Sequence, residues 1–240
     1  MVSGARAALA GCALAVAFGC VARAADDGDT ARWIFFSGID VWRNGGFLHG
    51  GTLWSPHGLD RPGFTLKTVI SGGDYRYISG TLNNTTVKGQ ESVVRVMPGW
   101  RFKSGKTEVT VFAGLDIENH RLTPDDPGSN LRGTDAGIRI AADFWTEPTD
   151  TTMAQLNAAV STIDGSYVLH AAFGWRALDK FYFGPEAARF ASGGYEQTRV
   201  GLHITALHIA NVEWSAGAGW ALDSDDRSGP YFRVGLLTRR

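Results

Sequence analysis

The sequence predicts an all-β fold, namely an antiparallel up-and-down transmembrane β-barrel of about 12 strands, preceded by a cleavable signal peptide. Three observations predict it. Long runs alternate between apolar and polar side chains, residues typical of turns separate these runs, and no segment after residue 25 has the period of a helix. The 240 residues suffice for one sizeable domain, and neither a linker nor a low-complexity tract divides them.

The first 24 residues have the composition of an export signal. Arg6 precedes a short apolar stretch, and the small residues around Ala24 suit cleavage after that position. The apolar stretch is too short for a membrane-spanning helix, and no later segment is long enough. Cys12 and Cys20 both lie within the signal, so the mature chain would carry neither a disulfide nor a cysteine metal site. We therefore expect a signal peptide over residues 1–24 and an outer-membrane β-barrel over residues 25–240.

About 12 alternating runs follow the signal, and turn-forming residues bound each of them. Separators such as NGG, KSGK, EPTD and DSDDRSG combine the glycine, proline, asparagine and aspartate that turns favour. Strands that cross a membrane need about 9–11 residues, which exceeds the usual strand length of about 5–6. The runs are long enough for that purpose. They cover residues 32–43, 47–55, 63–79, 86–102, 107–121, 133–146, 152–162, 166–176, 181–190, 195–206, 210–222 and 229–238.

The stretch NVEWSAGAGWALDSDD at residues 211–226 displays the alternation clearly. Val212, Trp214, Ala218 and Trp220 share one parity, whereas Glu213 and two glycines share the other. A soluble barrel turns its apolar face inward, whereas an outer-membrane barrel turns that face to lipid and lines its lumen with polar residues. The same alternation predicts an apolar face for Val200, Leu202, Ile204 and Ala206, and it recurs in residues 109–118 and 137–144.

Tryptophans favour the membrane barrel. Trp214 and Trp220 lie six residues apart on the apolar face, on the order of 20 Å along a strand, and aromatic girdles flank an apolar band about 25 Å tall. Trp42 and Trp145 fall on the polar parity unless a bulge intervenes. The tryptophans near run ends are Trp33, Trp54, Trp100, Trp145 and Trp175.

The lengths of the turns indicate which end of the barrel faces the periplasm and which faces the outside. If both termini lie in the periplasm, the periplasmic turns KSGK, EPTD, LDK and LHIA are short, and SPHGLDRPG is the exception. The external loops then include the longer segments TPDDPGSNLRG and DSDDRSG. Short periplasmic turns and longer external loops are typical of outer-membrane barrels.

Four stretches carry a resemblance to a known family. They are SGIDVWRNGGFLHGGTLW (37–54), DDPGSNLRGTDAGIRIAADFW (125–145), GPEAARFASGGYEQTRVGLHI (184–204) and AGAGWALDSDDRSGPYFRVGL (216–236). Their order and spacing resemble the BcsS family of cellulose-biosynthesis accessory proteins, over nearly all of the mature chain. The resemblance implies an exported envelope protein associated with bacterial cellulose production, and it supplies no catalytic residue.

We expect no catalytic residue, no cofactor site and no metal site. The six histidines have neither HExxH nor HxH spacing, and DSDDRSG lacks the glycine and the terminal glutamate of a calcium loop. Barrel hydrolases that use serine, histidine and an acid are an alternative. His170, His203, Glu213 and Ser215 share the lumenal parity, where a hydrogen-bond network is the more ordinary role.

Charged residues of both signs fall on the lumenal parity. Mixed signs indicate paired charges that fill and stiffen the interior rather than a ring of one sign that selects ions. A barrel of about 12 strands is wider than the eight-stranded barrel whose interior side chains can fill. The sequence therefore leaves two alternatives, a packed scaffold and a narrow pore. The predicted lumenal charges are Asp40, Glu91, Arg95, Asp116, Glu118, Arg139, Asp143, Arg176, Glu186, Arg199 and Glu213.

The net charge is −1 for the whole chain, which argues against a nucleic-acid partner. Our first hypothesis is a non-enzymatic outer-membrane protein that contacts lipid and assists cellulose biosynthesis or secretion. It would dock other components of the export machinery or let a glucan chain pass. The alternatives are an outer-membrane hydrolase acting on lipid or glycan and a soluble periplasmic barrel binding a small ligand in an apolar interior. A glucan path would use the lumenal aromatic residues Tyr75, Tyr77, Phe112, Tyr182 and Tyr231.

Overall fold

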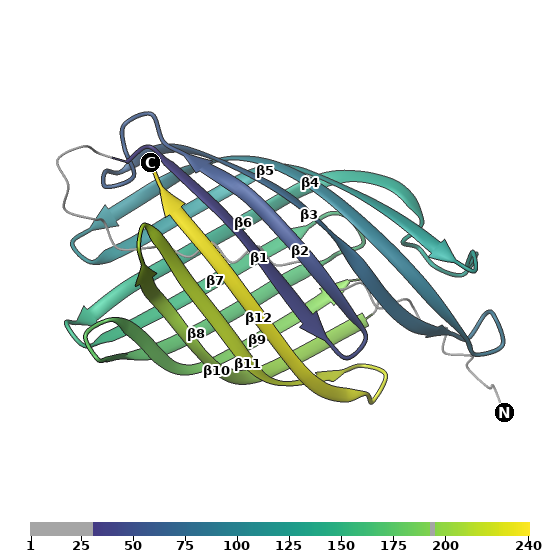
Figure 1. The fold of residues 1–240 in the computed structure, drawn as a ribbon. Helices are drawn as coiled ribbons and strands as arrows, with labels where there is room; N and C mark the ends of the chain where they lie inside the picture. Colours follow the sequence, from purple (N-terminus) through teal and green to yellow (C-terminus); the bar gives the residue numbers. More distant parts are fainter. Residues whose placement is uncertain (1–30, 193–194) are drawn as a thin grey trace, which may run out of the picture.

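The computed structural model describes residues 31–192 and 195–240, which form one closed antiparallel barrel (Figure 1). Each strand pairs with its neighbours in sequence, and β1 pairs with β12 to close the sheet, with Ile34 opposite Arg239 and Trp42 opposite Tyr231. The predicted signal peptide lies outside the described residues. The strands are β1 (Trp33–Trp42), β2 (Gly45–Trp54), β3 (Gly63–Ser79), β4 (Thr85–Ser104), β5 (Thr107–Thr123), β6 (Gly133–Thr149), β7 (Thr152–Ser161), β8 (Tyr167–Ala177), β9 (Phe181–Ser192), β10 (Tyr195–Ile209), β11 (Val212–Asp223) and β12 (Ser228–Arg239).

The predicted fold class is confirmed, and each predicted run corresponds to one strand. The turn predicted at LHIA is wrong in extent, because β10 continues to Ile209 and the chain reverses at Ala210 and Asn211. Within residues 31–192 and 195–240 no helix is long and apolar enough to cross a lipid bilayer.

The apolar face of the sheet points outward. On β11, Trp214 and Trp220 are 38% and 53% exposed, whereas Glu213 between them is 3% exposed. A soluble barrel with an apolar interior would show the reverse pattern, so that alternative is wrong. The outward face matches the lipid-facing surface of an outer-membrane barrel.

Two regions of the outer surface differ in polarity along the longest strands. On β4 the outward side chains are apolar from Val94 to Phe102 and polar at Lys88, Gln90 and Ser92. We call the apolar part of this surface, at the level of residues 94–102 of β4, the apolar belt. Figure 1 shows that β3 and β4 extend past the turn between β1 and β2. The far parts of these strands therefore rise beyond the belt.

We call the end of the barrel at Trp33 and Arg239 the terminal end and the opposite end the loop end. Connections at the terminal end are short except for residues 55–62, as the turn lengths predict. Exposed aromatic residues concentrate there, whereas Trp220 is the exposed tryptophan on β11 toward the loop end. The outward aromatic residues at the terminal end include Trp33, Phe35, Phe64, Trp100, Phe102, Phe173, Trp175, Phe183 and Trp214.

Trp42 and Trp145 point into the barrel, as their parity indicates. No bulge precedes Trp145, because the register of β6 and β7 shifts only between Thr146 and Thr149. Trp145 therefore does not belong to the outward-facing aromatic girdle, although it lies near the end of its predicted run. It packs instead in a buried cluster with Met153 and Tyr182.

The expectation that Ala206 lies on the apolar outer face is wrong. A β-bulge shifts the register of β10 and β11 between Ile204 and Leu207, and Ala206 has a positive φ of 60° and is 8% exposed. The extra residue lets Thr205 and Ala206 both face inward, while Leu207 and Ile209 stay at the outer face.

Candidate functional site: the filled lumen

The charges that parity assigned to the lumen do face the interior. All of them except Arg176 are buried. Arg176 lies near the terminal end of β8, 3.6 Å from Glu147, and donates a hydrogen bond to the Tyr182 hydroxyl. The alternation of β-strands was therefore a sufficient guide to this set of residues.

Ion pairs join strands that are not neighbours. One terminal nitrogen of Arg199 on β10 lies 2.8 Å from each carboxylate oxygen of Asp40 on β1. The guanidinium carbon lies 4.9–5.1 Å from the ring centroids of Trp42, Phe190 and Tyr231. Aromatic faces around a buried guanidinium supply cation–π attraction. This pair links the wall on either side of β11 and β12.

A second cross-lumen group surrounds Glu186 on β9. Its carboxylate accepts hydrogen bonds from the Arg233 guanidinium and, at 2.8 Å, from the Tyr231 hydroxyl. His170 Nε2 lies 3.2 Å from the same carboxylate. Several donors around one buried carboxylate compensate for the water that it loses.

A third group lies between β3, β4, β5, β6 and β7. Lys67 contacts Asp143 at 2.8 Å, and Arg95 contacts Asp116 at 2.7 Å. Arg139 contacts the other oxygen of Asp116 at 3.3 Å. Lys67 was not among the predicted lumenal charges, although its parity on β3 matches that of buried Val69. The mixed signs thus form pairs, as expected for a stiffened interior.

Apolar clusters lie toward both ends of the lumen, and we call them the loop-end and terminal-end closures. At the loop end, Leu131 and Ile163 from two connections pack against Trp42, Phe47 and other buried residues. At the terminal end, Leu59 from the connection 55–62 packs in a cluster with Phe36, Met97 and Phe112. Arg101 donates a hydrogen bond to the carbonyl of Leu59. The interior therefore combines buried ion pairs with apolar clusters toward both ends.

A buried carboxylate holds the connection between β5 and β6 over the loop end. Asp126 accepts hydrogen bonds from the Tyr77 hydroxyl at 3.0 Å, the Thr81 hydroxyl at 2.6 Å and the Gly128 N–H at 3.0 Å. Burial alone would raise the pKa of Asp126, but these hydrogen bonds and one from Ser79 outweigh it and hold the pKa below its usual value.

Two cavities in the interior are small. One of about 20 Å³ is lined by Asp40, His49, Glu213, Ser215 and Arg233 among others. Another of about 40 Å³ is lined by polar residues that include Lys67, Arg95, Arg139, Asp143 and Asn157. A water molecule needs roughly 10–15 Å³ of such space, so these cavities accommodate a few waters and no sugar ring.

The five aromatic residues considered for a glucan path all face the interior. They are buried, and their hydroxyl groups have partners: Tyr77 contacts Asp126, Tyr231 contacts Glu186, and Tyr182 contacts Arg176. Phe112 belongs to the closure of the terminal end. These rings pack the lumen and do not form an exposed platform.

The residues considered for a hydrolase have other partners. His203 Nδ1 contacts the Thr205 hydroxyl at 2.9 Å, and Nε2 contacts the carbonyl of Phe173 at 3.2 Å, so neither ring nitrogen faces Ser215. Glu213 lies 3.5 Å from His208 Nε2. These contacts of His203 and Glu213 are those of a lumenal hydrogen-bond network, the more ordinary role named for these residues in the sequence analysis.

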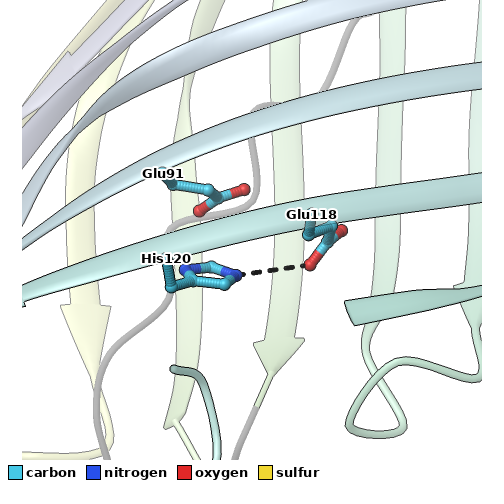
Figure 2. A group of neighbouring side chains, drawn as sticks. All are labelled: Glu91, Glu118 and His120. Atoms are coloured by element: carbon cyan, nitrogen blue, oxygen red, sulfur yellow. Dashed lines mark ion pairs between the residues drawn. The ribbon is translucent and has the colours of Figure 1, made fainter. Parts of the chain in front are cut away.

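The structure gathers one group that sequence reasoning missed. Glu91 on β4 and Glu118 and His120 on β5 each offer a ligand atom within 4.8 Å of the others. Figure 2 shows the three side chains together, with the ion pair between His120 and Glu118 marked. Glu118 and His120 share a face two residues apart, and Glu91 is the register partner of His120. That spacing is the signal that could have found them.

A sequence profile described as "Cellulose biosynthesis protein BcsS" matches residues 34–240. No curated protein sequence matches the chain.

Among solved structures, an outer-membrane channel from Pseudomonas putida F1 is similar with a TM-score of 0.59 and 10% identity, covering 90% of this chain and 100% of that one. The translocator domain of the autotransporter NalP from Neisseria meningitidis has a TM-score of 0.49 and 13% identity, covering 89% and 90%. The KdgM porin has a TM-score of 0.47 and 13% identity, covering 85% and 98%. At these identities the likeness to the Pseudomonas channel shows a shared barrel fold alone.

Proposed function

The chain belongs to the family of cellulose biosynthesis protein BcsS, and we propose that it is a non-enzymatic barrel of the bacterial outer membrane that assists cellulose biosynthesis or secretion as a packed scaffold. Export through a signal peptide over residues 1–24, leaving a barrel domain over residues 25–240, is part of this proposal. The observation that carries it is the filled lumen, in which buried ion pairs join strands that lie three positions apart in the sheet and apolar clusters lie toward both ends.

The filled lumen favours the scaffold over the narrow pore. A glucan chain passing through the barrel would need space that buried side chains now fill, including the Arg199–Asp40 and Arg233–Glu186 pairs. Separating a buried pair leaves an uncompensated charge. A rigid barrel can instead hold other components of the export machinery at its ends while the glucan passes beside it.

Conductance separates the two roles. We expect the purified chain, reconstituted in a planar lipid bilayer, to show no stable conductance steps. The matched comparison is a variant with Phe112→Ala and Met97→Ala, which removes two large side chains from the closure of the terminal end. A steady open-channel current from the unmodified chain would overturn the scaffold and favour the pore.

Cellulose output tests the role itself. Deleting the gene should lower the amount of secreted cellulose, and the unmodified gene should restore it. A double variant with Asp40→Leu and Arg199→Met keeps the interior filled without this ion pair, so a scaffold predicts that it restores output too. Restoration by the unmodified gene alone, with both proteins present at equal levels in the membrane, would mean that the lumenal charges act directly on the export process.

The glucan-path hypothesis has its own test. Because Tyr75 and Tyr77 are buried behind the residues at the loop end, we expect Tyr75→Ala and Tyr77→Ala variants to be retained on cellulose as much as the unmodified chain. Loss of retention in folded variants would mean that the aromatic residues of the lumen bind cellulose.

A further inference from the structure

The group of Glu91, Glu118 and His120 has the donor set of a metal site. All three side chains are buried, and their ligand atoms lie within 4.8 Å of one another. Two carboxylates and an imidazole are ligands that Zn²⁺ accepts. A cluster of acidic residues is not by itself evidence of a metal site. The hydrogen-bond partners and the orientation of each side chain are therefore considered in turn.

Glu91 supplies an independent observation. Its side chain is 2% exposed, and neither carboxylate oxygen has a hydrogen-bond partner among the described residues. A buried carboxylate without such partners is costly, and an unsatisfied buried group of this kind requires an explanation such as a bound ion. Figure 2 shows this carboxylate beside His120, on the side where Glu118 lies.

Glu118 and His120 are oriented for a shared ligand. Glu118 Oε1 accepts a hydrogen bond from Arg95 at 3.0 Å, which leaves Oε2 facing His120 Nε2 at 3.6 Å. His120 Nδ1 lies 3.3 Å from the Tyr75 hydroxyl. A hydrogen bond at one imidazole nitrogen fixes the ring so that the other can bind a metal.

The separations are compatible with coordination. Bond lengths of about 2.0–2.1 Å in a tetrahedral site place two ligand atoms about 3.4 Å apart, close to the 3.6 Å between Glu118 Oε2 and His120 Nε2. A ligand atom of Glu91 lies within 4.8 Å of those of Glu118 and His120. We propose that Glu91, Glu118 and His120 bind one divalent transition-metal ion, with Zn²⁺ as the ion that these ligands suit best.

The level of the site in the barrel indicates a structural role. The outward neighbours Gln90, Ser92, Asn119 and Arg121 are polar or charged, whereas Ile117 beside Glu118 is apolar, so the site lies at the border of the apolar belt on its loop-end side. Tyr75, which contacts His120, also belongs to the buried cluster at the loop end. An ion here would hold β4 and β5 together where the support from lipid ends. It would enter as the loop end forms.

Metal content and thermal unfolding test the proposal. The full chain is purified from membranes in detergent without chelator, and its metal content is measured by inductively coupled plasma mass spectrometry. We expect about one zinc ion per chain. Removal by EDTA should lower the Tm, and added Zn²⁺ should restore it, because an ion that binds only the folded state stabilises that state.

Three variants make the test specific. Glu91→Gln keeps the shape of the side chain and should abolish both zinc retention and the Tm response. Tyr75→Phe removes the partner of His120 and should weaken zinc affinity about 10- to 100-fold. Glu213→Gln is the control, because Glu213 is another buried lumenal carboxylate outside this group, and it should retain zinc. Glu118 is not replaced because it also pairs with Arg95.

In the competing arrangement the three side chains contact one another without a bound ion. In that case the purified chain would hold neither zinc nor another divalent transition metal in stoichiometric amount, and the Tm would not respond to Zn²⁺ or EDTA. Zinc binding by Glu91→Gln equal to that of the unmodified chain would also overturn the proposal. If Glu91→Gln does not fold, the metal content of the unmodified chain and the response of its Tm to EDTA still test the proposal.

Discussion

Arg199 and Asp40 form a buried ion pair between strands that two other strands separate, with 2.8 Å from one guanidinium nitrogen to each carboxylate oxygen. A contact of this kind constrains the cross-section of the barrel, because β1 and β10 cannot move apart without breaking it. The Arg233–Glu186 pair imposes the same constraint on β12 and β9. The interior is thus part of what defines the shape of the barrel.

Replacing Asp40 with Asn should destabilise the barrel by about 3–5 kcal/mol, because Arg199 stays buried without its counter-charge. Urea unfolding in lipid vesicles, followed by tryptophan fluorescence, measures the change. The double variant Asp40→Leu with Arg199→Met should recover most of the loss. Asp150→Asn, which breaks an exposed pair with Lys106, should leave the midpoint unchanged. Equal effects of Asp40→Asn and Asp150→Asn would contradict the role of the buried pair.

Tyr231→Phe should cost about 1.5–3 kcal/mol of stability, because the Tyr231 hydroxyl donates a hydrogen bond to the buried carboxylate of Glu186. The same unfolding measurement applies. Tyr167→Phe is the comparison, since its hydroxyl contacts Glu196 at 3.4 Å in a partly exposed position. A larger loss for Tyr167→Phe than for Tyr231→Phe would argue against the Glu186 group.

Ile140→Arg should destabilise the protein in lipid by about 2–4 kcal/mol, because Ile140 lies outward at the middle of the apolar belt. Gln90→Arg places the same side chain on the outer face beyond the belt and should have little effect. Both are compared by unfolding in vesicles. Similar costs at the two positions would mean that the belt does not mark the lipid-facing surface.

The pKa of Asp126 lies below its usual value, so its hydrogen bonds contribute stability that is complete above the unfolded-state pKa of about 3.9. That contribution is lost as the pH falls through the lower pKa of the folded state. The protection of residues 124–132 from hydrogen exchange, relative to the unfolded chain at the same pH, should therefore stay high at neutral pH and fall only below about pH 4. Asp126→Asn should show less protection at neutral pH and lose the acid-dependent step. A loss of protection near pH 6 would contradict this assignment.

Ala206→Gly should be neutral or stabilise the barrel by up to about 1 kcal/mol, because the φ of 60° at the bulge is costly for a residue with a side chain. Ala221→Gly is the matched control, as Ala221 is buried in regular strand β11. It should destabilise by about 0.5–1 kcal/mol. Both values come from thermal or urea unfolding, and a loss at Ala206 equal to that at Ala221 would exclude strain at the bulge.

The sequence predicted the barrel, its strands and the side of the wall on which most side chains lie. It did so because a strand has a period of two, so a residue such as Glu213 between two tryptophans can be assigned without coordinates. Ala206 was misplaced because one extra residue in a strand reverses the alternation, and an alanine in left-handed backbone leaves no mark in the sequence. The pattern fails wherever the period is interrupted.

The closures and the cross-lumen contacts were not predictable in the same way. Leu59, Leu131 and Ile163 lie in connections, which have no period. The Arg199–Asp40 pair depends on how the closed sheet is staggered, which no local pattern states. The pairing of Glu91 with His120 was within reach, because the tight turn at residues 105–106 sets the register of β4 and β5.

The loop-end and terminal-end closures have a consequence for the cell. Each open channel inserted into a membrane lets small solutes and toxic compounds leak, so the number of such channels has to be controlled. In the scaffold role proposed above, a barrel plugged by its own side chains would add no leak. Many copies could then stand side by side at the surface while the envelope keeps its permeability barrier.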